Sequence, residues 1–138
     1  GAGKTTFAQG FAAALDVAGP VTSPTFALVR QYRCGAASPV STLIHADVYR
    51  TGSLEEIADL ALAELVEEDA VVLVEWGDVA APALGADALE ITIQAPDPVG
   101  APERRTIAAR GRGTWRARAG DVADALAQEG APPEPVTP

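Results

Sequence analysis

The 138-residue sequence contains no methionine, one cysteine and one histidine, and aromatic residues make up only 5% of it. A single thiol, Cys34, cannot form an intramolecular disulfide framework, and it is too few for a cysteine-based zinc site. Disulfide scaffolds and zinc-ribbon classes are therefore excluded. Because no methionine is present, we expect Gly1 to lie within a longer gene product rather than at its natural start.

Positive charge and long apolar stretches are also scarce. Ten lysine and arginine residues stand against 19 aspartate and glutamate residues, a net charge of −9. This balance argues against non-specific binding to nucleic acid or to an anionic membrane. No apolar run approaches the roughly 18 residues of a membrane helix. With no signal-peptide pattern at the start, we expect a cytoplasmic protein.

The first six residues predict a phosphate-binding loop. They match the second half of the pattern G-x-x-x-x-G-K-[ST], whose opening glycine would lie before residue 1. Glycines let successive backbone N–H groups point at one anion. Lys4 would neutralise the β- and γ-phosphates, and the Thr5 hydroxyl would ligate Mg²⁺. The predicted nucleotide-binding residues of this loop are Gly1, Ala2, Gly3, Lys4, Thr5 and Thr6.

The rest of the chain alternates between helical and extended patterns. Apolar spacing predicts a helix from Lys4 to about Leu15, directly after the loop. Further patterns predict strands over 26–32, 42–47, 70–74, 88–95 and 104–110, a helix capped by Ser53 with an apolar face to Leu65, and a helix over 121–128. The continuous apolar run at 70–74 is typical of a strand buried on both faces.

These elements predict an α/β P-loop fold, with a central mixed, mostly parallel sheet flanked by helices. The first strand of that sheet would lie before Gly1. The length suits a single domain, which we place at residues 1–128. Residues 129–138 contain four prolines and few apolar side chains, which predicts a disordered tail.

Two carboxylates at the ends of predicted strands are candidates for the chemistry of a triphosphate site. Glu75 follows the apolar run at 70–74, where a carboxylate would hold Mg²⁺ or its water shell; the alternative is a surface glutamate. Asp47 ends the strand at 42–47 and would join the metal shell or position the attacking water; alternatively, it caps the following turn. We predict Glu75 and Asp47 as catalytic residues, and Thr5 and Glu75 as the Mg²⁺ ligands.

The neighbours of these acids leave more than one role open. His45 is a lone histidine beside an apolar strand, which is more often a structural hydrogen-bonding group than a ligand. Trp76 would stack on a base, seal the site, meet a partner protein or simply pack. The six arginines over 104–118 would face a partner, an RNA or a phosphate, or form a solvated surface.

Four motifs, in this order, resemble the bacterial TsaE family, small P-loop ATPases of tRNA threonylcarbamoyladenosine biosynthesis. The motifs are Gly1-Ala2-Gly3-Lys4-Thr5-Thr6, Ser23-Pro24-Thr25-Phe26, His45-Ala46-Asp47-Val48-Tyr49-Arg50 and Val74-Glu75-Trp76-Gly77-Asp78. A large superfamily shares the phosphate loop, whereas the other three motifs together are far more specific. The resemblance covers about residues 1–80.

The resemblance implies an ATPase that binds ATP and Mg²⁺ and supports turnover of the TsaB–TsaD pair. That pair transfers a threonylcarbamoyl group to an adenosine of ANN-decoding tRNAs, so tRNA would be met only through the complex. Carried over by position, the resemblance puts Thr25 and Phe26 in a switch-like segment near the nucleotide. It gives Asp47 and Trp76 roles in hydrolysis or partner coupling, and we count Thr25 and Trp76 among the nucleotide-binding residues.

Two other functions stay open. A small-molecule kinase would need an acceptor pocket and an arginine-bearing lid, for which Arg30, Arg33 and Arg50 are available. The segment from Glu75 to Asp78 has no obvious role in such a kinase. A non-catalytic switch module would bind nucleotide without hydrolysing it, but such a module does not need both Thr5 and Glu75.

Overall fold

The computed structural model describes residues 2–24, 28–49, 51, 53–60, 62, 65, 69–95 and 105–129. Contacts within the chain divide it into two compact units, Gly1–Gly85 and Ala86–Pro138, and we describe each by itself. One domain over 1–128 stays a prediction. Of the predicted tail at 129–138, only Glu129 lies within the described residues, as the last residue of a helix.

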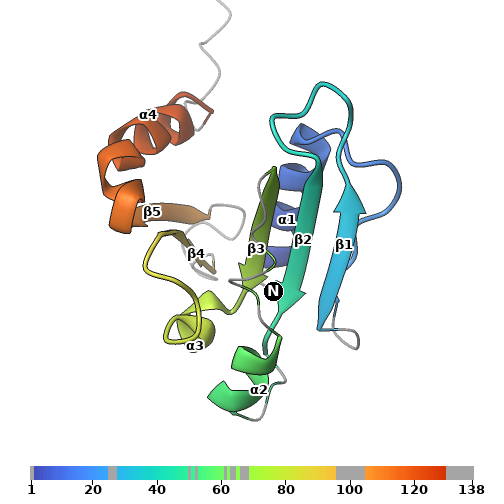
Figure 1. Cartoon of the computed structure of the whole chain (residues 1–138). Coiled ribbons are helices and arrows are strands. Elements are labelled where there is room, and N and C mark those ends of the chain that lie inside the picture. Colours follow the sequence, from blue (N-terminus) through green and yellow to red (C-terminus); the bar gives the residue numbers. More distant parts are fainter. Residues whose placement is uncertain are drawn as a thin grey trace, which may run out of the picture. The chain divides into compact units, whose positions relative to one another are not determined.

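The first unit begins with helix α1 (Lys4–Ala14), which lies against one face of a three-stranded sheet (Figure 1). Alanine is the best helix former, and four of the residues of α1, at positions 8, 12, 13 and 14, are alanine. The face that the spacing predicts is the one that is buried, and the helix ends within one residue of the predicted Leu15. The core beside it contains Ala12, Leu15, Val21, Cys34 and Leu43.

The sheet of the first unit is mixed, with the strand order β1-β2-β3. Strands β1 (Val29–Arg33) and β2 (Thr42–Asp47) run antiparallel. Strands β2 and β3 (Ala70–Glu75) run parallel, with Asp47 opposite Glu75. The carboxyl ends of β2 and β3 therefore meet at one edge of the sheet (Figure 1). The strand predicted at 26–32 begins at Val29, and residues 25–27 lie outside the described part of the chain.

Strand β2, rather than β3, is the buried strand of this sheet. Every residue from Leu43 to Asp47 is buried, whereas Ala70–Val74 are half-buried. In the described sheet β2 has a neighbour on each side and β3 has only one. The prediction of a strand at 70–74 is confirmed, but the prediction that both its faces are buried is wrong. An apolar run reports the character of the side chains and not the place of a strand in its sheet.

Two short helices complete the first unit. The hydroxyl of Ser53 accepts a hydrogen bond from the Glu56 backbone N–H at 3.2 Å, which caps α2 (Leu54–Asp59) as predicted. This helix ends at Asp59, earlier than the predicted Leu65. Helix α3 (Gly77–Ala80) follows β3 directly. A second core cluster joins the two helices to the end of β2 and contains Val48, Ile57 and Ala80.

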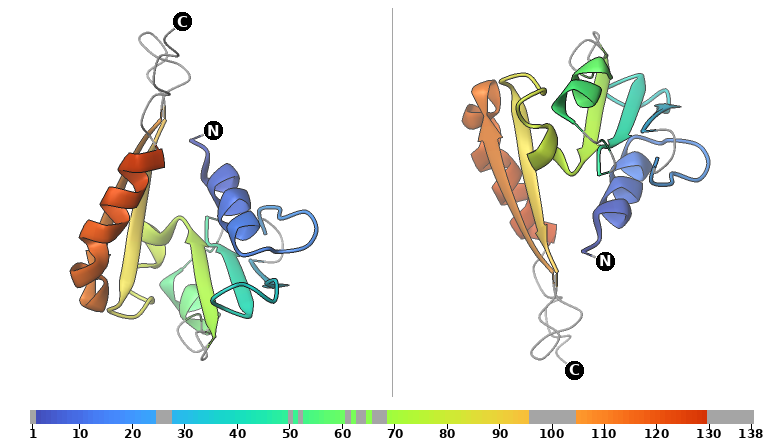
Figure 2. Two further views of the ribbon diagram at one scale, coloured as in Figure 1. Left: turned by 90° about the horizontal axis from the view of Figure 1, so that it is seen from above. Right: turned by 90° about the horizontal axis from the view of Figure 1, so that it is seen from below.

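The second unit consists of a hairpin and a C-terminal helical segment. Strands β4 (Ala88–Gln94) and β5 (Thr106–Arg112) run antiparallel, and the 3-10 helix η1 (Gly113–Arg118) leads into α4 (Ala119–Glu129). Figure 2 shows α4 lying along β5. Strand β4 agrees with the predicted 88–95. Strand β5 lies two residues beyond the predicted 104–110, and residues 96–104 lie outside the described part.

The turn from β5 into η1 requires glycine. Gly113 has a φ of 56°, and a Cβ at this position would collide with the Asp87 carboxylate. That carboxylate accepts a hydrogen bond from the backbone N–H of Thr114 at 2.8 Å. The turn is therefore closed by a short polar contact for which only a residue without a side chain leaves room.

Arginines of the second unit make local contacts. The guanidinium of Arg112 pairs with the Glu90 carboxylate at 3.0 Å, and the guanidinium of Arg118 lies 4.4 Å from the centroid of the Trp115 ring. These two arginines therefore contribute to the packing of the hairpin and η1. Among the described helices, none combines the length and apolar character that crossing a bilayer requires.

Candidate functional site

Two carboxylates lie at the edge where β2 and β3 end. Asp47 and Glu75 are the last residues of their strands and are direct partners in the parallel register. Only 8% of Asp47 and 7% of Glu75 is exposed. Because a buried carboxylate needs hydrogen-bond donors, the partners of each acid indicate what holds it in place.

Both oxygens of the Asp47 carboxylate accept hydrogen bonds. Ser23 Oγ donates to Oδ2 at 2.7 Å, and the Tyr49 backbone N–H donates to Oδ1 at 3.1 Å. The second bond closes the turn after β2, which is the structural role that the sequence left open for Asp47. The first bond fixes the segment before β1 to the end of β2. Sequence reasoning missed it because no periodicity links residues that far apart.

Glu75 is held by a different donor. Its Oε1 accepts a hydrogen bond from His45 Nε2 at 3.0 Å, and His45 is completely buried. His45 and Asp47 are two positions apart in β2, so their side chains leave the same face of the sheet. The parallel register puts Glu75 on the neighbouring strand beside both. The alternation along β2 puts His45 on the face of Asp47, but only the register of β2 and β3 brings Glu75 within reach of His45.

Trp76 directly follows Glu75 and has a φ of 62°, a left-handed conformation that is rare for a bulky residue. Its ring centroid lies 4.8 Å from that of Tyr49 and 4.0 Å from the Nζ atom of Lys4. The side chain is 37% exposed, so it is not simply a core residue. Through Lys4, the predicted phosphate loop reaches the end of β3.

The start of α1 has the features of an anion site. Gly3 is the N-cap with a φ of 105°, a conformation that glycine adopts far more readily than other residues. Among the described residues, no side chain caps this helix and its first turn holds no acid. Its N–H groups and the positive end of its dipole are therefore open to an anion.

The remaining predicted loop residues differ in exposure. Ala2, Lys4 and Thr5 are half-buried and Thr6 is exposed. Gly1 and Thr25 lie outside the described residues. The structure thus brings together Lys4, Trp76, Glu75 and Asp47 at one edge, through Lys4 over the Trp76 ring and through the register of β2 and β3.

A comparison with protein-family models matches residues 1–106 to the family described as threonylcarbamoyl adenosine biosynthesis protein TsaE. The chain belongs to the TsaE family. The family resemblance that the four sequence motifs carry is therefore confirmed, and the match extends beyond them into the second unit.

Three curated relatives, each named tRNA threonylcarbamoyladenosine biosynthesis protein TsaE, are similar to the chain. The protein of Mycobacterium tuberculosis is 41% identical over 99 residues, covering 68% of this chain and 58% of its own. The protein of Streptomyces coelicolor is 42% identical over 94 residues, covering 67% of this chain and 62% of its own. The protein of Bacillus subtilis is 42% identical over 94 residues, covering 68% of this chain and 56% of its own. The chain spans about three fifths of the length of these relatives.

A solved structure also resembles this TsaE-family chain. The crystal structure of YdiB from Bacillus subtilis superposes with a TM-score of 0.62 at 27% sequence identity, covering 95% of this chain and 73% of that one. Together with the family match and the mixed sheet beside α1, this likeness confirms the predicted α/β P-loop fold.

The residues of the site suit Mg²⁺ only in the company of phosphate. In the described part of the chain, no group of three or more histidine, cysteine, aspartate or glutamate side chains could hold a metal ion. Mg²⁺ commonly keeps several waters and binds one or two carboxylates together with substrate phosphates. Glu75 has a carboxylate oxygen, Oε2, with no hydrogen-bond partner among the described residues. A carboxylate oxygen of this kind is a donor that Mg²⁺ takes alongside phosphate.

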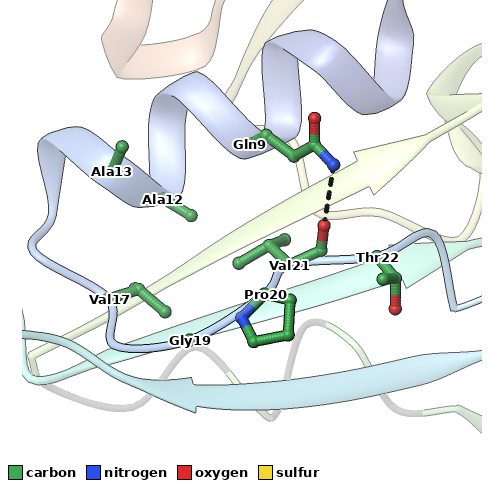
Figure 3. A pocket seen from close by; sticks show the side chains of 8 residues that line it. All are labelled: Gln9, Ala12, Ala13, Val17, Gly19, Pro20, Val21 and Thr22. Atoms are coloured by element: carbon green, nitrogen blue, oxygen red, sulfur yellow. Dashed lines mark hydrogen bonds between the residues drawn. The ribbon is translucent and has the colours of Figure 1, made fainter.

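A cavity of about 280 Å³ in the first unit lies elsewhere, between α1 and the segment that follows it (Figure 3). Gln9 Nε2 donates a hydrogen bond to the Val21 carbonyl at 3.0 Å in its wall. None of the site residues predicted from the sequence lines it, so we do not assign it to the candidate site. The other lining residues are Ala12, Ala13, Val17, Gly19, Pro20 and Thr22.

Proposed function

We propose that the complete protein is the ATPase subunit of tRNA threonylcarbamoyladenosine synthesis. It binds ATP and Mg²⁺ where β2 and β3 end, hydrolyses the ATP, and thereby supports repeated turnover of the TsaB–TsaD complex in the cytoplasm. The names of the curated relatives support the pathway. The observation that carries the site is the contact of Lys4 with Trp76, which joins the phosphate loop to the residue after Glu75.

In this proposal the phosphates are held by the first turn of α1. The backbone N–H groups from Gly1 to Thr6 and the Lys4 ammonium bind the β- and γ-phosphates. A cation–π contact is worth about 0.5–1 kcal/mol at an exposed site, whereas a hydrogen bond to a charged group contributes about 1.5–3 kcal/mol. Lys4 therefore leaves the Trp76 ring when phosphate is present. Thr25 and Trp76 contact the rest of the nucleotide.

Glu75 and Asp47 have separate parts in hydrolysis. Glu75 and the Thr5 hydroxyl hold Mg²⁺, which when bound neutralises charge that develops on the phosphates. Asp47 positions the attacking water. Although both its oxygens already accept one hydrogen bond, each has a second lone pair. Phosphoryl transfer depends mainly on such positioning and charge neutralisation, so no further covalent chemistry by the protein is needed.

The partners in this proposal are proteins, and tRNA is met through them. A chain with a net charge of −9 has no general attraction to a polyanion. TsaB and TsaD would therefore provide the tRNA contacts, and this subunit would provide ATP hydrolysis.

The test is phosphate release by the complete protein, alone and with TsaB, TsaD and tRNA. We expect slow hydrolysis alone, faster hydrolysis with the partners, and repeated formation of the modified adenosine. Equal repeated formation without this protein would contradict the proposal. Transfer of phosphate to a small-molecule acceptor instead of water would identify a kinase, and nucleotide binding without hydrolysis under any condition would identify a switch module.

A further inference from the structure

His45 is fully buried in the central strand of the sheet, yet only one of its ring nitrogens has a partner. Nε2 lies 3.0 Å from Glu75 Oε1. Nδ1 is buried and has no hydrogen-bond partner among the described residues. Since an ionised carboxylate can only accept, the hydrogen of the existing bond is on Nε2. Among the described residues, the imidazole therefore makes one hydrogen bond, which it donates to Glu75.

This arrangement is not what stability alone would select. A buried polar atom without a partner destabilises the folded state, and an apolar side chain of similar size would avoid that cost. The neighbours of His45 in β2 are Ile44 and Ala46, and both are buried. The chemistry that an apolar side chain lacks is the N–H that donates to Glu75. Departures from the most stable choice are expected at functional positions.

We propose that His45 is a positioning residue for the metal site. Its Nε2–H holds Oε1 of Glu75 and so fixes the carboxylate in one orientation, leaving Oε2 to serve Mg²⁺ or a water of its shell. This inference rests on the proposed function, because it names a residue that orients a ligand of the proposed Mg²⁺ site. Hydrogen bonds to ligating carboxylates orient the ligand and tune the affinity for the metal.

The backbone around Glu75 adds to this positioning. The Glu75 carbonyl accepts a hydrogen bond from the Val48 N–H at 3.4 Å, and the left-handed Trp76 ends the strand immediately afterwards. Asp47, the neighbouring carboxylate, has its own donors in Ser23 and Tyr49. The two acids of the site are therefore fixed by separate groups, and loss of His45 would release Glu75 alone.

The experiment measures binding of a fluorescent N-methylanthraniloyl-ADP to the complete protein as Mg²⁺ is raised, and again in EDTA. His45→Ala should raise the Mg²⁺ concentration that gives half of the Mg²⁺-dependent increase in nucleotide binding by about 10- to 100-fold. Its affinity for the nucleotide in EDTA should equal that of the parent. His45→Gln should recover part of the loss, because its side-chain amide also donates a hydrogen bond. In a Glu75→Ala background, His45→Ala should add nothing.

The matched control is Tyr32→Phe. The Tyr32 hydroxyl, in β1 of the same sheet, is likewise buried without a hydrogen-bond partner among the described residues, so it donates no hydrogen bond to Glu75. Tyr32→Phe should leave the Mg²⁺ dependence of the parent unchanged. A similar rise in both variants would mean that general loosening of the sheet is responsible, and would overturn the role of His45.

The remaining outcomes separate this inference from the proposed function. A parent protein that binds the nucleotide equally with and without Mg²⁺ would overturn both. A Mg²⁺-dependent parent with an unchanged, folded His45→Ala variant would overturn only the role of His45. If both His45 variants unfold, the nitrogen-15 spectrum of the parent's His45 imidazole decides. Its Nε2–H signal should shift when Mg²⁺ joins bound ADP, and an unmoved signal would overturn the inference.

Discussion

The ammonium of Lys4 lies 4.0 Å from the centroid of the Trp76 ring, and the same ring lies 4.8 Å from that of Tyr49. This contact joins the start of α1 to the end of β3, two segments more than 60 residues apart in the sequence. The lysine of the phosphate loop thus lies over the side chain that directly follows the candidate metal carboxylate, Glu75.

Replacing Lys4 should weaken nucleotide binding. Lys4→Ala removes the one side-chain cation that we assign to the phosphates, and a hydrogen bond to a charged group is worth about 1.5–3 kcal/mol, or about 10- to 150-fold in affinity. Isothermal titration with ATP and Mg²⁺ measures the change. Arg33→Ala, which removes an exposed cation at the end of β1, is the control and should bind as the parent does. Equal affinity in all three proteins would remove Lys4 from the site.

Nucleotide binding should change the emission of Trp76. In a Trp115→Phe background, Trp76 is the remaining tryptophan of this chain, and departure of the Lys4 ammonium alters the charge next to its ring. The emission maximum should shift as ATP is added and should saturate with the binding curve. In Lys4→Ala the nucleotide-free emission should already differ from that of the parent. An emission spectrum indifferent to ATP would show that Lys4 stays over the ring.

Removing the Glu75 carboxylate should stop hydrolysis while some nucleotide binding survives. Loss of one preorganised electrostatic group commonly costs about 100- to 1,000-fold in kcat, whereas the N–H groups of α1 remain. Steady-state phosphate release and binding by Glu75→Ala measure the two effects separately. Glu55→Gln, on the exposed side of α2, should match the parent in both. Hydrolysis at the parental rate by Glu75→Ala would exclude Glu75 from the chemistry.

Asp47→Asn separates the structural role of Asp47 from its catalytic one. Asparagine has no negative charge and a single acceptor oxygen, so the bonds from Ser23 and from the Tyr49 N–H lose their charge assistance and only one of the two donors can still be accepted by an oxygen of residue 47. This should lower the free energy of unfolding by about 1–3 kcal/mol. Urea unfolding measures this loss. Hydrolysis at a temperature where the variant is fully folded should fall as well. Parental hydrolysis by the folded variant would leave Asp47 as a turn cap only.

The turn into η1 should not tolerate a side chain at Gly113. Gly113→Ala requires a φ of 56° from alanine and drives its Cβ into the Asp87 carboxylate, so we expect destabilisation by more than the roughly 1–2 kcal/mol of the left-handed backbone alone. Gly120→Ala is the control in the same unit, because nothing lies within 4 Å of a Cβ there, and it should cost nothing. Thermal unfolding compares the two variants. Equal melting temperatures would contradict the packing around Gly113.

Local features of this protein could be read from the sequence because they depend on neighbouring residues. The glycines and the apolar spacing predicted the loop and α1, Ser53 with Glu56 predicted the cap of α2, and apolar runs predicted β2 and β3. The order of four motifs also identified the family. For the loop, the helices and the strands, the deciding feature is a backbone conformation, a hydrogen bond or a side-chain pattern within a few residues, so the information lies inside one short window.

Features that join distant segments were decided only by the tertiary structure. The sequence proposed Asp47 and Glu75 one at a time, but the strand register made them neighbours and gave them different donors, Ser23 and His45. It also made β2, and not β3, the buried strand. The approach of Lys4 to Trp76 has the same origin. Strand order and register result from burying the apolar faces of the whole sheet at once, and that sum over distant residues leaves no pattern in any one segment.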